Sequence, residues 1–390
     1  MDFGIPDEHR ALRTAVADVA AGFGNDYYTR KAEAREFTGE LWVALGKHGY
    51  LGVNIPEEHG GGGAGLTELA IVCEETAAQG CPLLLLLVSS AISGEVIGAF
   101  GTPEQRARWL PRLASGEGKI VFAITEPDAG SNTHRLATTA VRDGEQYVLR
   151  GQKYYISGVD EADAILVVAR TGTDAGGAGS GGGGAALSLF VVDVAAPGLT
   201  AQPLPVSVAL PERQFTLFFD DVRVPADRLI GDEGEGFRQV FHGLNPERVT
   251  GAALCVGIGR YALAKAARYA TERVVWGDTP IGAYQGVSHA LAKAKIEVET
   301  AALMTAKAAW LHDHGQPAGE ASNMAKYAAA EAAIAAIDAA IQCHGGNGVS
   351  TEHGLIPLWG LARLLRIAPV NREMILNYVA QHSLGLPRSY

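Results

Sequence analysis

The sequence predicts an α+β protein in which an N-terminal all-α domain and a C-terminal helical bundle flank a middle antiparallel β domain. The spacing of apolar residues supports this division. It changes from the 3.6-residue period of helices to the 2-residue period of strands at Lys119, and the helical period returns near Gly234. The composition, with 47% hydrophobic and 19% charged residues, is typical of a globular chain. We place the three domains at residues 1–118, 119–232 and 233–390.

Charge and composition argue against several classes of protein. The formal net charge of −11 argues against non-specific nucleic-acid binding, which needs a basic face. The apolar run at residues 83–88 is far too short to span a bilayer, and the first five residues show no signal-peptide pattern, so we expect no membrane insertion. The four cysteines lack metal-site or redox-motif spacing, so we expect no metal site. Scattered thiols fit a reducing compartment, so we expect a cytoplasmic location. The cysteines are Cys73, Cys81, Cys255 and Cys343.

Helical patterns fill the N-terminal domain. Residues 40–46 give an apolar face ended by glycine, and a further helix is predicted over residues 66–78. Another helix begins after Thr102, because Thr102 can cap it, Pro103 suits its first position and Gln105 completes a capping box.

Strand patterns separated by Gly, Pro and Asp turns fill the middle domain. Five strands are predicted, at residues 120–124, 146–151, 165–169, 187–194 and 215–224. The glycine-dominated stretch at residues 171–184 is predicted to be a long flexible connection. It is not a phosphate loop, since no G-K-[ST] follows it.

Four helical runs are predicted in the C-terminal bundle. Asn245 can cap the first helix and Pro246 suits its first position, with the helix running to Ala270 or beyond. The next two helices are predicted over residues 284–312 and 319–343, and the last runs from 361 to 380 with an interruption at Pro369.

Two strand-to-turn stretches in the middle domain carry candidate ligand chemistry. After the first strand, Pro127 prevents continuation, and the small residues 129–131 would let a flat or phosphorylated ligand approach the backbone. These residues alone fit a surface turn equally well. Residues 151–158 again run an aromatic strand into a hydroxyl and a glycine.

Together the two stretches resemble the flavin-binding patterns T-E-P-x-A-G-S-D and G-x-K-x-[WFY]-I-[TS] of the acyl-CoA dehydrogenase family. The resemblance extends over essentially the whole chain and implies that family's fold, with a C-terminal four-helix bundle, and FAD as cofactor. Tyr155 stands where the family often has tryptophan, and the tyrosine ring keeps a π face at this position. The resemblance implies that the flavin is lined by Phe122, Thr125, Gly130, Ser131, Tyr155, Ile156 and Ser157.

Two segments of the bundle extend the resemblance. Residues 273–277 with Gln285 are similar to the family's R-x-x-F-G…Q segment, with Trp276 replacing phenylalanine, and residues 342–346 are similar to its glycine pair after a helix. In that family both segments reach the FAD of a neighbouring subunit, so the resemblance implies a homo-oligomer, a dimer or tetramer. The cofactor-binding residues implied here are Arg273, Gln285, Gln342, Gly345 and Gly346.

The catalytic base is where the chain departs from the common family pattern. Pro369 occupies the position of the usual glutamate, in the run 368–371. A smaller group of the family carries its base on the first bundle helix, directly before an arginine, and here that residue is Glu247, before Arg248. Residue chemistry alone would let Glu247 merely complement the helix dipole. As a base it would need apolar burial to raise its pKa.

Other residues near these motifs have secondary roles by resemblance. Asn371 and Glu373 are expected to contact the cofactor, and Glu373 and Glu352 are reserve candidates for the base. The residues expected to bind substrate are Ser131, Asn245 and Arg248.

Pro369 also has no N–H to donate to the thioester oxygen. Three alternatives follow: a neighbouring N–H such as that of Val370 takes over, the oxyanion pocket is weaker, or the chemistry differs.

The predicted function is FAD-dependent dehydrogenation of an acyl-CoA to a trans-2-enoyl-CoA, in fatty acid metabolism. Glu247 would remove the α-proton and the β-hydride would pass to flavin N5. Electrons would leave to an electron-transfer flavoprotein or a similar acceptor. The alternatives are a flavin oxidase or monooxygenase, an acyl-carrier-protein dehydrogenase, and a non-catalytic acyl-CoA- or flavin-binding protein.

Overall fold

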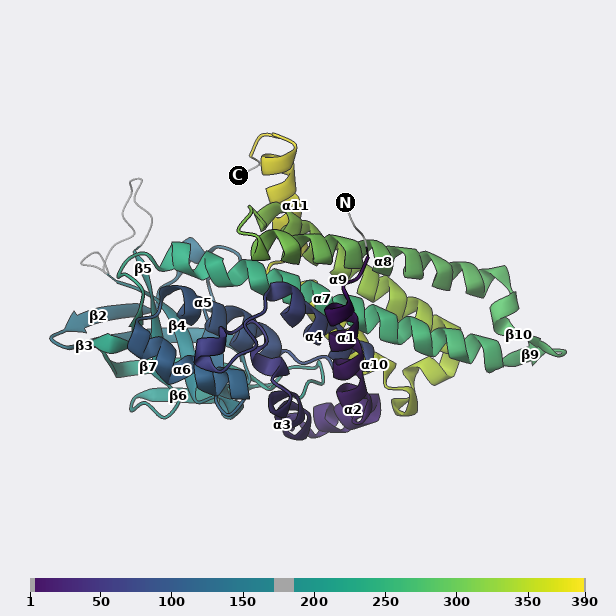
Figure 1. Ribbon diagram of the computed structural model, residues 1–390, viewed down its shortest axis with the longest axis horizontal. Coiled ribbons are helices and arrows are strands. Elements are labelled where there is room, and N and C mark those ends of the chain that lie inside the picture. The colour runs from purple at the N-terminus through teal and green to yellow at the C-terminus, as the bar shows by residue number, and fades with distance from the viewer. Residues whose placement is uncertain (1–3, 172–185, 389–390) are drawn as a thin grey trace.

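The computed structural model describes residues 4–171 and 186–388, in which helices, a sheet and a helical bundle follow one another along the chain (Figure 1). The β-sheet lies at one end of the molecule, and the long helices of the bundle extend away from it to the other end (Figure 1). Buried side chains of the N-terminal helices, the sheet and the bundle pack into one continuous core. The domain limits 1–118, 119–232 and 233–390 stay a proposal.

Six helices form the N-terminal part: α1 (Asp7–Ala21), α2 (Gly24–Ala34), α3 (Gly39–Lys47), α4 (Leu66–Ala78), α5 (Glu95–Phe100) and α6 (Pro103–Ser115). A π-helical segment, Leu86–Gly94, precedes α5. The predicted capping box starts α6, because the Gln105 N–H donates to Thr102 Oγ1 (3.3 Å) and the Thr102 N–H donates to Gln105 Oε1 (2.9 Å).

The middle sheet contains more strands than the five predicted. Its strands are β1 (Ile120–Ala123), β2 (Thr139–Asp143), β3 (Gln146–Ser157), β4 (Ala164–Arg170), β5 (Leu187–Asp193), β6 (Leu199–Leu204), β7 (Gln214–Pro225) and β8 (Leu229–Ile230). Strands β2, β6 and β8 were not predicted, and the run 146–151 is the first half of a longer strand.

Most strand pairs are antiparallel, as predicted, in the order β6-β7-β3-β2-β4-β5-β8. Two exceptions are parallel: β1 pairs with β4, and β2 meets β4 at a single pair, Thr139 with Arg170. The predicted flexible connection at 171–184 lies, beyond Thr171, outside the described residues.

The bundle consists of α7 (Gly236–Glu272), α8 (Gln285–Asp313), α9 (Gly319–His344), α10 (Leu355–Leu365) and α11 (Arg372–Tyr378). A small hairpin, β9 (Val274–Trp276) and β10 (Thr279–Pro280), joins α7 to α8. The predicted interruption near Pro369 separates α10 from α11. In the described ranges, no helix is long and apolar enough to cross a membrane.

The prediction that Asn245 and Pro246 begin the first bundle helix is wrong. Helix α7 begins at Gly236, so Pro246 lies inside it. The first turns stay helical because Gln239 and Val240 are buried, and this tertiary packing offsets the backbone hydrogen bond that proline cannot donate. The Asn245 side chain accepts a hydrogen bond from Arg248 Nη1 (2.7 Å) instead of capping.

Candidate active site

A buried ion pair fixes the loop that follows β1. Lys153, on β3, is fully buried, and its Nζ donates to Glu126 Oε1 (2.8 Å) and to the Ile124 carbonyl (2.9 Å). The Glu126 carboxylate also accepts the N–H groups of Ala137 (2.6 Å) and Thr138 (3.0 Å). The two predicted flavin stretches therefore lie side by side, joined by a pair to which the sequence analysis gave no role. The only sign of this ion pair in the sequence is that Glu126 and Lys153 occupy the glutamate of the T-E-P motif and the lysine of the G-x-K motif.

The end of β3 presents an aromatic ring outward. The β3–β7 register shifts between Lys153 and Ile156, and Tyr155 has a positive φ of 57° with 54% of its surface exposed. Ile156 packs in the core, which leaves only its main chain for a ligand. Ser157 Oγ accepts a hydrogen bond from Gln214 Nε2 (2.9 Å).

These residues fit a flat, phosphate-bearing cofactor. A Cβ added at Gly130 would meet no atom within 4 Å, so the loop has open space where a ligand could approach. The exposed ring of Tyr155 offers a π face close in space, since the N–H of the preceding Tyr154 donates to the Thr125 carbonyl (2.8 Å). The hydroxyls of Thr125, Ser131 and Ser157 offer donors. Phe122, on β1, is buried in a second and smaller core cluster, separate from the core that joins the three parts of the chain.

Asn371 connects this loop to the bundle. Its Nδ2 donates to Ser131 Oγ (2.6 Å), and its Oδ1 accepts the Met374 N–H (2.8 Å) at the start of α11. Two predicted site residues separated by 240 positions are thereby brought together. Glu373, on the same turn, is 74% exposed and lies 3.6 Å from Arg372 Nε, and Glu352 is exposed as well, so neither carboxylate is buried.

The other predicted cofactor residues lie at the opposite end of the bundle, where Figure 1 shows β9 and β10 far from the sheet. There the imidazole of His344 stacks on Tyr269 (4.2 Å between ring centres), and Asn347 Nδ2 donates to Tyr269 Oη (3.2 Å). Gly345 has φ 60° and ψ −133°, a conformation that only glycine adopts readily. The residues at this distal end are Arg273, Gln285, Gln342, Gly345 and Gly346, which one chain does not bring to its own Gly130 loop.

Glu247 is a buried carboxylate on α7. It is 9% exposed, and among the described residues no hydrogen bond or ion pair to its carboxylate is present. Burial raises the pKa of Glu247 to about 8, against the attraction of the neighbouring Arg248 and Lys326 charges. Such a carboxylate can accept a proton near neutral pH.

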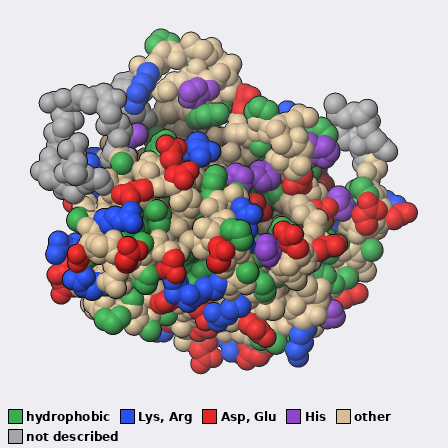
Figure 2. All heavy atoms as spheres, turned by 60° about the vertical axis from the view of Figure 1, so that its left-hand side comes forward, with side chains coloured by type: hydrophobic (Ala, Val, Ile, Leu, Met, Phe, Trp, Pro, Cys, Tyr) green, Lys and Arg blue, Asp and Glu red, His purple; other side chains and the backbone are tan. Residues whose placement is uncertain are grey.

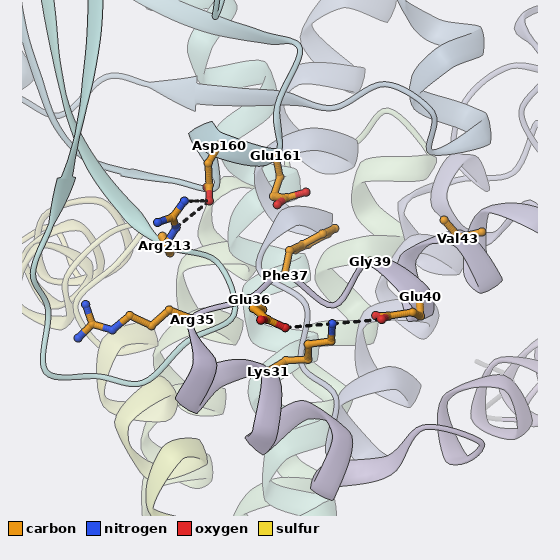
Figure 3. Close-up of a pocket in the computed structure, with 10 residues that line it drawn as sticks. All are labelled: Lys31, Arg35, Glu36, Phe37, Gly39, Glu40, Val43, Asp160, Glu161 and Arg213. Carbon is orange, nitrogen blue, oxygen red and sulfur yellow. Dashed lines mark hydrogen bonds and ion pairs between the residues drawn. The ribbon is translucent and has the colours of Figure 1, made fainter.

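A separate surface cavity of about 790 Å³ opens between α2, α3 and the turn at residues 159–161 (Figure 3). Its charged side chains pair with one another, as in Arg213 with Asp160 (2.6 Å) and Lys31 with Glu40 (3.1 Å). Figure 2 likewise shows acidic and basic side chains interspersed over the face that it presents. We assign no catalytic role to this cavity, because none of the predicted site residues lines it.

Three family models match the chain: the acyl-CoA dehydrogenase N-terminal domain over residues 6–117, the middle domain over 121–222 and the C-terminal domain over 234–384. The acyl-CoA dehydrogenase FadE12 of Mycobacterium tuberculosis H37Rv is 54% identical over 386 residues, which cover 98% of each chain.

Two solved structures are similar over nearly their full length. The glutaryl-coenzyme A dehydrogenase–glutaryl-CoA complex has a TM-score of 0.92 and 30% identity, with 100% of this chain and 98% of that chain covered. The FAD complex of PigA has a TM-score of 0.90 and 26% identity, with coverage of 99% and 100%.

Proposed function

The chain belongs to the acyl-CoA dehydrogenase family of FAD-dependent oxidoreductases, and we propose that it oxidises an acyl-CoA to the trans-2-enoyl-CoA with Glu247 as the base. The observation that carries this proposal is the buried, unpaired Glu247 carboxylate with a pKa of about 8. Pro369, at the position of the family's common glutamate, has no side chain that can accept a proton.

The residues of this chain have distinct tasks in the proposed reaction. FAD, when bound, supplies the acceptor for the β-hydride. The Glu247 carboxylate takes the α-proton, and its burial keeps water from competing for that proton. Negative charge then develops on the thioester oxygen, where main-chain N–H groups stabilise it. Asn245 and Arg248 lie on the same helix as Glu247 and are joined by a hydrogen bond, and we propose that both contact the substrate.

The residues proposed to hold FAD come from two copies of the chain. One copy supplies the loop at Gly130 and the end of β3, and the distal group around Arg273 reaches the FAD of a second copy. Exposed apolar side chains support a homo-oligomer. Ile296, Leu303 and Trp310 recur every seven residues along α8 and are exposed, and Trp276 on β9 is exposed as well. Light scattering would give the molar mass, and a monomer with full FAD content would contradict this arrangement.

The test of the function is anaerobic mixing of the FAD-loaded protein with acyl-CoAs of different chain length and branching. We expect at least one to bleach the flavin absorbance and to yield an enoyl-CoA. A flavin that stays oxidised with every acyl-CoA would contradict the proposal. The same acyl groups on a carrier protein test the alternative substrate.

Addition of oxygen or of an electron-transfer flavoprotein to the reduced enzyme then identifies the acceptor. We expect fast reoxidation by the flavoprotein and little peroxide with oxygen. Fast peroxide formation would identify an oxidase instead.

A further inference from the structure

Lys326, on α9, is a buried lysine to which the proposed reaction gives no role. Only 2% of its surface is exposed, and buried lysines are rare unless they are paired. No carboxylate of the described residues lies within ion-pair distance of it. Its Nζ instead donates to the main-chain carbonyl of Val370 (2.6 Å). A buried cation is thus held by the residue directly after Pro369.

The segment 369–371 is fixed at two points. Lys326 holds the Val370 carbonyl from α9, and Asn371 holds Ser131 of the flavin loop with its amide (2.6 Å). Within the described residues, neither the Val370 N–H nor the Asn371 N–H has a hydrogen-bond acceptor. Two main-chain N–H donors without an acceptor therefore follow Pro369, which has no N–H of its own.

The other side of Lys326 faces α7. Its charge interacts with Glu247, Arg248 and Cys255 of that helix and with Glu331 of its own helix. From α11, Tyr378 interacts with Arg248. Lys326 thus contacts the segment after Pro369 and interacts electrostatically with the proposed base.

We propose that Lys326 is a positioning residue: it anchors the Val370 carbonyl so that the free N–H groups of segment 369–371 face the thioester oxygen. The inference rests on the proposed function. Since a trans peptide is planar, fixing the Val370 carbonyl also fixes the direction of the Asn371 N–H on the same peptide.

The variants K326M and K326R both disturb the anchor of the Val370 carbonyl. K326M removes the donor, whereas K326R replaces the compact ammonium by a larger planar group and so displaces the donor. N323A is the matched control, because Asn323 is a buried polar residue one turn earlier on α9 that bonds only the Gly319 carbonyl (2.9 Å) among the interactions described. Melting temperature and flavin content are measured first, to show that each variant is folded and loaded.

Binding is then titrated by the change in flavin absorbance with two ligands, an enoyl-CoA that has the thioester carbonyl and an alkyl-CoA thioether that lacks it. In K326M we expect the enoyl-CoA to bind about tenfold more weakly, the usual effect of losing one hydrogen bond, and the thioether to bind as in wild type. N323A should bind both ligands as wild type does.

The proposal is overturned if K326M weakens both ligands equally, or if its carbonyl preference matches wild type. If K326M does not fold, K326R decides: it should lose the carbonyl preference, and retention of that preference overturns the inference. E247Q separates this from the proposed function. An active E247Q refutes the base, whereas an inactive E247Q beside an unaffected K326M refutes only the positioning role.

Discussion

Replacing Glu247 by glutamine should reduce the loss of folding stability at alkaline pH. The pKa of Glu247 rises from 4.5 to about 8 on folding. The unfolded chain therefore ionises this group at lower pH than the folded chain does. Its contribution to stability is complete below pH 4.5 and is lost as pH rises through about 8. At about 1.36 kcal/mol per pKa unit, the loss reaches at most about 5 kcal/mol.

Glutamine keeps the shape of the side chain and cannot ionise, so E247Q should not show this loss. The assay is denaturant unfolding of the FAD-loaded protein without substrate, at about pH 4 and about pH 9, values chosen to bracket the two pKa values. We expect E247Q to be more stable than wild type at the higher pH and similar to it at the lower. The control E352Q changes an exposed glutamate and should follow wild type. Parallel pH dependences of wild type and E247Q would refute the burial argument.

Three further outcomes follow from the structure. The rate of flavin reduction by acyl-CoA at low substrate should rise with pH to a midpoint near 8, because Glu247 must be ionised, and a stopped-flow rate that is flat between about pH 6 and 9 would contradict this. K153M leaves Glu126 buried without its cation, so it should cost about 3–5 kcal/mol and release FAD, measured as unfolding free energy and flavin content. A stable, yellow K153M would show that the pair does not hold the loop. L303E places a charge in the apolar stripe of α8 and should lower the molar mass in light scattering, and an unchanged mass would exclude this stripe from an interface.

Features encoded in a few neighbouring residues could be predicted from the sequence. The capping box at Thr102 and Gln105 formed as predicted, because its partners are three positions apart. The order of helices, then strands, then helices along the chain and the position of helix α4 were likewise predictable from the hydrophobic period. The break near Pro369 was predictable from the chemistry of proline.

Features that depend on tertiary packing were not predicted. Asn245 and Pro246 have the local chemistry of a helix start, but burial of the preceding turns extends α7 back to Gly236. The edge strand β6 is mostly exposed and gives little apolar alternation.

Within the candidate site, the sequence indicated Glu247 only through its resemblance to a family. The pair of Lys153 with Glu126 spans 27 positions, and the contact of Lys326 with Val370 spans 44. In sequence, Lys326 is one lysine in an alanine-rich helix, and only the packing of α9 against α7 and α11 gives it a place beside the base.

Anaerobic reduction of bound FAD by an acyl-CoA, compared between wild type and E247Q, tests the central claim most directly. We predict that wild type is bleached and that E247Q, with the same flavin content, is reduced at least about a hundredfold more slowly, since the group that accepts the α-proton is gone. Reduction of E247Q at the wild-type rate would contradict the assignment of Glu247 as the base.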